Sequence, residues 1–255
     1  MKNITIRSIV VWLVAGLFLT NVTGCKKDDK KNDALPTPNQ NNGIVFNPNL
    51  TYGTVTDIDG TVYKTITIGN KGTKTTQTWM AENLKVIKYN NGDSIPNVSE
   101  NVGWGNLTDG AYCNYENSNS NTAIYGRLYN WYVVNDARNI CPTGWHVPTD
   151  AEWTELSTFL GGDSIAGGKM KETGTTHWVS PNEGATNESG FTAVPSGFRN
   201  YVGVFGSLTY YNYWWSATEA SISNAYYRGT SCNYIILNNT DGDKRQGFSV
   251  RCLMD

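Results

Sequence analysis

The chain has 255 residues, of which 39% are hydrophobic and 16% charged, with a formal net charge of −2 at pH 7. This slightly acidic balance does not provide the basic surface that phosphate recognition requires, so nucleic acid is not an expected partner. The globular part has a length that β-rich proteins commonly fold as one domain.

The first 24 residues have the features of an export signal. Lys2 and Arg7 provide a positive start, and the apolar stretch from Ile9 to Thr20 is too short to be a good membrane span. The run Val22-Thr-Gly-Cys25 looks like the lipobox of bacterial lipoproteins, whose cysteine is acylated and becomes the first residue. We therefore expect Cys25 to be a lipid anchor; the alternative is an ordinary signal peptide with an incidental cysteine.

A polar segment follows this cysteine. Lys26-Lys-Asp-Asp29 resembles the tag that exports some lipoproteins to the outer face of the outer membrane, although charge runs are also simply solvated. Residues 25–50 have few apolar side chains to offset their conformational entropy and are predicted to be a flexible tether. The sequence thus predicts an outer-membrane lipoprotein facing the cell exterior, with a signal peptide at 1–24 and a folded domain at 51–255.

Two segments of the first half show periodicity. Thr61 to Ile68 alternates, with Val62, Ile66 and Ile68 on one side, and the glycines that follow predict a hairpin returning through Thr75 to Trp79. The segment from Ile124 to Ile140 has apolar residues near helical spacing and is predicted to be a first helix.

A second helix is marked more strongly. Thr149 and Glu152 form a Thr-x-x-Glu capping box, and Gly161-Gly162 provides a stop signal. We place this helix at Asp150 to Leu160.

Beyond Gly161 the sequence is rich in Gly, Asn, Ser, Thr and aromatic residues, which predicts long loops and short strands. A closing hairpin is expected around Asp241-Gly242, with Cys252 on the inward face of its last strand. Two helices, short antiparallel strands and a long loop-rich C-terminal half predict an α+β fold.

Six short blocks cover nearly all of the globular part: Thr78-Trp-Met-Ala-Glu-Asn-Leu84, Tyr125-Gly-Arg-Leu-Tyr-Asn-Trp131, Cys141-Pro-Thr-Gly-Trp-His-Val-Pro-Thr-Asp-Ala-Glu-Trp153, Gly190-Phe-Thr-Ala-Val-Pro-Ser-Gly197, Tyr213-Trp-Trp-Ser-Ala-Thr218 and Gly247-Phe-Ser-Val-Arg-Cys252. In this order they resemble the Fibrobacter succinogenes major paralogous (FISUMP) domain. That bacterial surface domain looks like a divergent relative of the C-type lectin and formylglycine-generating-enzyme folds. The resemblance therefore implies a C-type-lectin-like fold.

The resemblance also implies a disulfide. C-type-lectin-like domains join a cysteine at the end of their first helix to one in their last strand, and Cys141 and Cys252 occupy those positions here. Such a bond closes a loop of roughly 110 residues, which in the chain-entropy model constrains the unfolded state by about 4 to 5 kcal/mol. Cys113 and Cys232 are left either to form a second pair or to stay reduced.

Enzyme motifs fail when they are compared residue by residue. The sequence has no G-x-S-x-G elbow, and its two histidines are too few for a typical histidine zinc site. His146 lies between Trp145 and Val147 and is interpreted as a packed, hydrogen-bonded structural residue. The formylglycine-generating relatives use a reactive cysteine pair, of which only Cys232 would remain here beside the disulfide.

Calcium is weighed in the same way. Lectins of this fold hold calcium with a Glu-Pro-Asn or Gln-Pro-Asp run, and neither is present. Pro181-Asn-Glu183 and Asn187-Glu188 supply loop oxygens, and Asn239, Asp241 and Asp243 alternate before Lys244. Polar turn residues explain both clusters more simply than calcium does, so no metal or cofactor is expected.

Aromatic residues gather in the C-terminal half, interleaved with Asn, Ser and Thr. Flat rings beside short polar side chains suit sugar faces and protein epitopes alike. Trp214-Trp215 is better explained as core. The residues predicted to bind a ligand are Tyr210, Tyr211, Tyr226, Tyr227 and Arg228.

We interpret the chain as a noncovalent binding or adhesion module at the cell surface, with a glycan or a surface protein as its ligand. Two alternatives are an oxidase-like enzyme of the formylglycine-generating type and a structural surface-coat protein without a ligand.

Overall fold

The computed structural model of the protein describes residues 43–69 and 75–255. The predicted signal peptide, Cys25 and the tether up to residue 42 lie outside the described residues. Contacts divide the chain into two units, Met1–Asp33 and Ala34–Asp255, and the described residues belong to the second. Within these two described stretches, no helix has the length and apolar character needed to cross a bilayer.

The folded part begins earlier than the predicted domain start at residue 51. The backbone N–H of Val45 donates to Oε1 of Glu172 at 2.6 Å, and the Asn47 side chain donates to the carbonyl of Asn187 at 3.0 Å. The Phe46 ring lies 4.2 Å from the ammonium of Lys64. The tether prediction is therefore wrong for residues 43–50, because these contacts hold them against the domain.

The first sheet has the strand order β1-β2-β3-β12-β6. Its strands are β1 (Gly53–Thr56), β2 (Val62–Gly69), β3 (Thr76–Met80), β12 (Leu253–Met254) and β6 (Trp145–His146). The predicted hairpin is confirmed, since β2 and β3 pair antiparallel with Ile66 opposite Trp79. Tyr63 is buried on one face, and Ile66 and Ile68 on the other. Two residues depart from the expected pattern: Val62 is 58% exposed, and Thr65, on the side without aliphatic residues, is 5% exposed.

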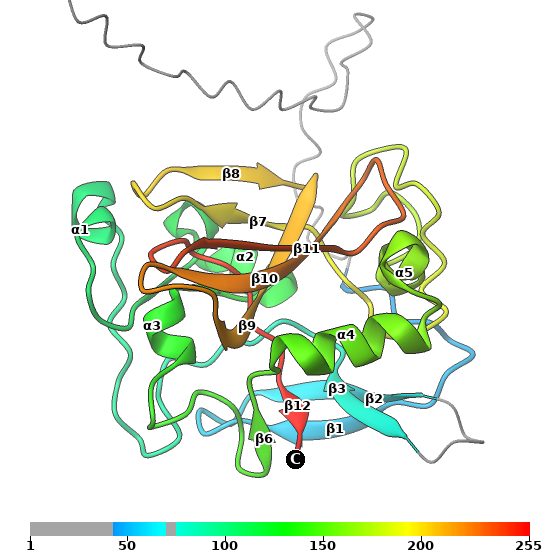
Figure 1. The fold of residues 1–255 in the computed structure, drawn as a ribbon, viewed down its shortest axis with the longest axis horizontal. Coiled ribbons are helices and arrows are strands. Elements are labelled where there is room, and N and C mark those ends of the chain that lie inside the picture. Colours follow the sequence, from blue (N-terminus) through cyan, green and yellow to red (C-terminus); the bar gives the residue numbers. More distant parts are fainter. Residues whose placement is uncertain (1–42, 70–74) are drawn as a thin grey trace, which may run out of the picture. The chain divides into compact units, whose positions relative to one another are not determined.

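The second sheet has the order β11-β10-β9-β7-β8 (Figure 1). Its strands are β11 (Asn238–Asp243), β10 (Asn224–Ser231), β9 (Tyr211–Glu219), β7 (Ser196–Arg199) and β8 (Phe205–Leu208). Strands of eight and nine residues in this half show that it is less loop-rich than expected.

The predicted closing hairpin around Asp241-Gly242 is wrong. Both residues lie inside β11, where Asp241 pairs with Tyr226 and Gly242 with Ala225. A Cβ atom at position 242 would lie 3.0 Å from Cε1 of Tyr227. The glycine therefore leaves space for a ring and does not make a turn.

Short helices connect and cover the sheets. The described residues contain α1 (Asn101–Gly105), α2 (Asn119–Tyr125), α3 (Trp131–Val134), α4 (Asp150–Phe159), α5 (Asp163–Met170) and a 3₁₀ turn at Tyr115–Asn117. A two-stranded ribbon of β4 (Tyr112–Cys113) and β5 (Leu128–Tyr129) lies among them. This mixture of helices and largely antiparallel sheets agrees with the α+β prediction.

The two predicted helices have different outcomes. The helix from Asp150 is confirmed, with a complete capping box between Thr149 and Glu152. The single helix over 124–140 is wrong. Gly126 interrupts it with φ +75°, and a Cβ atom there would lie 2.7 Å from Cβ of Asn83. This close approach turns the chain, and the next residues enter β5 before α3 begins.

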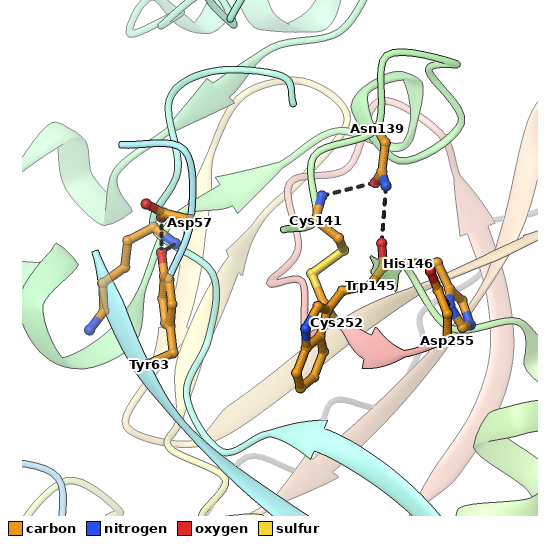
Figure 2. Close-up of a disulfide and its surroundings, with 9 residues drawn as sticks. Asp57, Tyr63, Asn139, Cys141, Trp145, His146, Cys252 and Asp255 are labelled. Atoms are coloured by element: carbon orange, nitrogen blue, oxygen red, sulfur yellow. Dashed lines mark hydrogen bonds and ion pairs between the residues drawn. A yellow bond between two sulfur atoms is a disulfide. The ribbon is translucent and has the colours of Figure 1, made fainter. Parts of the chain in front are cut away.

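A disulfide joins Cys141 to Cys252, across a sequence separation of 111 residues. Figure 2 shows how Asn139 fixes the backbone around it: its side chain accepts from the N–H of Cys141 at 2.9 Å and donates to the carbonyl of Trp145 at 3.0 Å. Both half-cystines belong to the main hydrophobic cluster, beside Trp145 and Val250. The bond thus lies inside the core and links the segment before β6 to the residue before β12.

Replacing both Cys141 and Cys252 with Ser should lower the free energy of unfolding by about 2 to 5 kcal/mol, because the long loop is no longer closed in the unfolded chain. Urea unfolding of both proteins measures the difference. Dithiothreitol should destabilise the wild type to a similar level and leave the double variant unchanged. Equal stability of wild type and variant would contradict this account of the bond.

Candidate ligand-binding face

Three tyrosines lie on one face of the second sheet, and we call Tyr211, Tyr213 and Tyr227 the tyrosine face. In the register of β9 and β10, Gly229 is opposite Tyr213 and Tyr227 is opposite Trp215. The rings of Tyr211 and Tyr213 are parallel within 7°, with centroids 5.8 Å apart. The Tyr227 ring stands at 88° to that of Tyr213, 5.5 Å away. All three side chains are half-buried, so each ring keeps an exposed part.

Glycines beside two of these rings hold them close to the sheet. A Cβ atom at Gly229 would lie 2.6 Å from Cδ1 of Tyr213, and one at Gly242 would lie 3.0 Å from Cε1 of Tyr227. Glycine in a strand interior commonly marks such a close approach. Tyr213 and Tyr227 therefore lie over backbone that carries no side chain.

Buried aromatic side chains support the tyrosine face from below. The Phe248 centroid is 5.2 Å from that of Tyr213 and 4.7 Å from that of Tyr227, and Phe248 itself is buried. Burial raises the pKa of Tyr213 and of Tyr227 above the ordinary value of 10.0. Their hydroxyls therefore stay neutral at physiological pH, and each can donate or accept a hydrogen bond.

Polar side chains of β11 border this face. Asn238 is opposite Gly229 and Thr240 is opposite Tyr227, and directly opposite residues of antiparallel strands project to the same side. Both Asn238 and Thr240 are exposed. The arrangement offers ring surface, phenolic hydroxyls, an amide and a second hydroxyl without a formal charge.

The structure brings only some of the predicted ligand residues together. Tyr211 and Tyr227 belong to the tyrosine face. Tyr226 precedes Tyr227 in the same strand and so projects to the opposite side. Tyr210 lies in the turn before β9, where its carbonyl accepts from the N–H of Cys232 at 2.9 Å. In the described part of the chain, no ring contact joins Tyr210 or Tyr226 to the tyrosine face.

The prediction of a ligand role is wrong for Arg228. Its side chain is fully buried and its guanidinium donates to Oδ1 of Asp150 at 2.8 Å and to Oγ1 of Thr154 at 2.7 Å. A further ion pair reaches Asp163 at 3.4 Å. Arg228 therefore ties β10 to the first turns of α4 and α5. Strand alternation explains the error, since neighbours of Tyr227 face the other way.

Sequence reasoning missed Tyr213, Asn238 and Thr240 as members of the surface. The alternation Tyr211, Tyr213 within one strand was a usable signal for Tyr213. Asn238 and Thr240 had none, because their place depends on the pairing of β11 with β10.

The two cysteines outside the disulfide do not pair with each other. Cys113 is buried in a cluster with Trp104, Tyr115 and Leu128, and burial raises the pKa of its thiol to about 12. A thiol that stays protonated is a poor nucleophile, which favours a packing role for Cys113. Cys232 is also buried, and its carbonyl accepts from the N–H of Glu183 at 2.7 Å.

Carboxylates of the clusters weighed for calcium have other partners. Glu188 pairs with Lys169 at 2.9 Å, whereas Asn182 uses its amide nitrogen to donate to the carbonyls of Glu172 and Gly174 at 2.9 and 2.7 Å. Asp241 accepts from the Asn224 amide at 2.8 Å. Over residues 43–69 and 75–255, no three His, Cys, Asp or Glu side chains are grouped so that they could hold a metal ion.

The two histidines each contact carboxylates. His177 lies 2.7 Å from Glu172 in a buried pair, next to the N-terminal segment that Glu172 also holds. His146 lies 2.6 Å from Asp255 through Nδ1 (Figure 2). Its Nε2 lies 3.0 Å from Glu152. Partial burial lowers the pKa of His146, but the hydrogen bonds to Asp255 and Glu152 outweigh it and the net pKa is raised. His146 thus joins the C-terminus to the start of α4.

Residues 73–254 match the family described as the Fibrobacter succinogenes major domain. Among curated proteins and solved structures, none matches the chain. The family match covers the disulfide and the whole tyrosine face.

His146 should make stability depend on pH. The folded protein binds this proton more tightly than the unfolded chain, so the contribution is complete below the ordinary pKa of 6.5 and is lost as pH rises through the raised value. Because the imidazole is 35% exposed, we expect less than about 1 kcal/mol. Urea unfolding should show His146→Gln less stable than wild type near about pH 5.5, with a smaller difference near about pH 8.5. A larger difference at the higher pH would reverse the assignment.

Proposed function

The chain belongs to the Fibrobacter succinogenes major domain family, and on this basis we propose that it is a binding module that recognises a glycan noncovalently through the tyrosine face. The observation that carries this proposal is the cluster of the partly buried tyrosines Tyr211, Tyr213 and Tyr227 beside the exposed, uncharged side chains of Asn238 and Thr240. The ligand class follows from this chemistry.

A sugar ring has one face of C–H groups and a rim of hydroxyls. Tyrosine offers a large, stiff contact area at low cost in conformational entropy, and its hydroxyl remains available for hydrogen bonds. The stacked rings of Tyr211 and Tyr213 supply apolar contact area, and Asn238 and Thr240 supply donors and acceptors for the rim. The uncharged lining favours a neutral glycan over an acidic one. A surface protein is the competing ligand, and the same experiment distinguishes it.

We place this module on the cell surface. The support is the lipobox-like run ending in Cys25 and the polar segment after it, which would hold the domain away from an outer-membrane anchor. A C-type-lectin-like fold is part of the same proposal, supported by the Cys141–Cys252 disulfide.

Alanine at both Tyr211 and Tyr213 should weaken glycan binding by about fivefold or more, since the two rings together supply about 1 to 3 kcal/mol. Glycan panels identify the ligand, and isothermal titration then gives the affinities. Tyr234→Ala is the matched control, because Tyr234 is 49% exposed and outside the tyrosine face. Gly229→Ala should also weaken binding, because the new methyl group displaces the Tyr213 ring.

Two further results bear on this prediction. Binding should survive EDTA, since no calcium is proposed to take part. Tyr213 and Tyr227 both pack on buried Phe248, so alanine at either position should lower stability by about 2 kcal/mol. The affinity of the double variant is therefore measured under conditions where circular dichroism shows it to be fully folded. A panel on which no glycan binds, or unchanged affinity of the double variant, would refute the glycan proposal.

Cys25→Ala should abolish acylation and release the protein from the membrane fraction. Metabolic labelling with a fatty acid analogue and fractionation measure both effects. The wild type carries the label, and Cys113→Ala is a control that removes a different cysteine. Label that persists in Cys25→Ala would overturn the lipid anchor.

A further inference from the structure

Four large apolar side chains are exposed together at one end of the second sheet, and we call them the apolar tip. Val102 comes from α1 and is 77% exposed; Tyr201, Val202 and Val204, in the turn between β7 and β8, are 49%, 51% and 51% exposed. Figure 1 shows α1 and this turn at the same end of the molecule. Single exposed apolar residues are ordinary, but a contiguous group marks an interaction surface.

A buried arginine fixes the two halves of the apolar tip to each other. Arg199 donates from Nε to the carbonyl of Gly203 at 2.8 Å and from its two terminal nitrogens to the carbonyls of Val98 and Ser99 at 2.6 Å each. Its guanidinium also lies 4.5 Å from the Trp104 ring. One fully buried side chain thus joins the turn to the segment that leads into α1.

The turn itself is tightly built. The Asn200 side chain accepts from the N–H groups of Val202 and Val204 at 3.1 and 2.8 Å. Gly203 has φ +91°, and a Cβ atom there would lie 2.6 Å from Cα of Asn101. Close backbone packing and these bonds prevent the valines from turning inward. The apolar tip is therefore preorganised, which reduces the entropy lost on binding.

We propose that the apolar tip is a docking site for a partner protein whose surface has an apolar pocket with a basic rim. The exposed acidic residue at the tip is Glu100, which directly precedes α1. The basic residue that reaches the tip, Arg245, lies 5.5 Å from the Tyr201 ring and forms an ion pair with Asp243 at 2.5 Å. The local charge that is left to a partner is thus negative, and its complement is basic.

The same charges disfavour two other binding partners of the apolar tip, an anionic membrane and a second copy of the chain. Elements that insert into anionic membranes carry Lys and Arg around their apolar side chains, whereas this tip carries Glu100. A symmetric dimer through the tip would place the same net negative charge on both sides of the interface, without a basic complement. The proposal is independent of glycan binding, because it uses none of the residues of the tyrosine face.

The experiment places a photo-crosslinking benzoylphenylalanine at position 202 of the full chain in its native cells. The control carries it at Ile222, which is 95% exposed in the turn between β9 and β10. We expect a discrete adduct with one protein from position 202 and none from position 222. An adduct with a second copy, an adduct with lipid alone, or no adduct would overturn the proposal.

The captured protein is then purified and its affinity for the intact chain measured. Val102→Ser and Val202→Ser should each weaken binding by about tenfold, and Ile222→Ser should leave it unchanged. Glu100→Lys should weaken binding more at low salt than at high salt, since screening removes the charge effect. Melting temperatures should be unchanged because these side chains are exposed. The inference would be overturned, even if an adduct forms, by an affinity that Val202→Ser leaves unchanged. It would also be overturned if Glu100→Lys weakened binding more at high salt than at low salt.

Discussion

The C-terminal segment from Gly247 to Leu253 is the constraint on which both sheets depend. Gly247 exchanges backbone hydrogen bonds with Arg199 of β7, and Phe248 does so with Tyr129 of β5. Ser249 donates to Tyr213 of β9 at 3.0 Å, and the carbonyl of Cys252 accepts from Met80 of β3 at 3.0 Å. Because a single strand satisfies the backbone of elements from every part of the domain, its loss would separate the two sheets. The disulfide holds this strand at its far end.

Buried arginines donate hydrogen bonds to backbone carbonyl groups that the irregular segments leave without a partner in a sheet. Irregular segments leave carbonyl groups without a ladder partner, and an unpaired buried carbonyl is costly. Arg251 donates to the carbonyl of Thr192 at 3.0 Å and to Oδ1 of Asn83 at 2.9 Å, and it also reaches the carbonyl of Phe191. Arg199 acts in the same way elsewhere, whereas Arg228 binds mainly the side-chain oxygens of Asp150, Thr154 and Asp163. Five donors in a planar fork allow one side chain to satisfy several loops at once.

Strand β7 contributes to both proposed surfaces, through neighbouring residues whose side chains contact different parts of the domain. Phe198 of β7 packs against Tyr213, 5.8 Å between centroids, at the margin of the tyrosine face. Its neighbour Arg199 is directed into the interior and fixes the apolar tip. Many hydrogen bonds and packing contacts in the interior hold both surfaces in place. Residues of either surface therefore lose little conformational entropy when a ligand binds.

Features that depend on neighbouring residues can be predicted from the chain alone. The capping box at Thr149 and Glu152 and the strand within Thr61 to Ile68 follow from local spacing, and the structure contains both. The motifs that resemble a known family agree with the family match. Local hydrogen bonds and periodic burial act over a few residues, so they can be read from the chain directly.

Long-range packing explains the roles of Gly126, Arg228 and Gly242. Gly126 breaks a helical pattern because Asn83 lies against it, and Gly242 leaves room for Tyr227 from the neighbouring strand. Arg228 is structural because α4 covers its side of β10. Each outcome depends on which residue from a distant part of the chain occupies the adjacent space, and no local pattern contains that information.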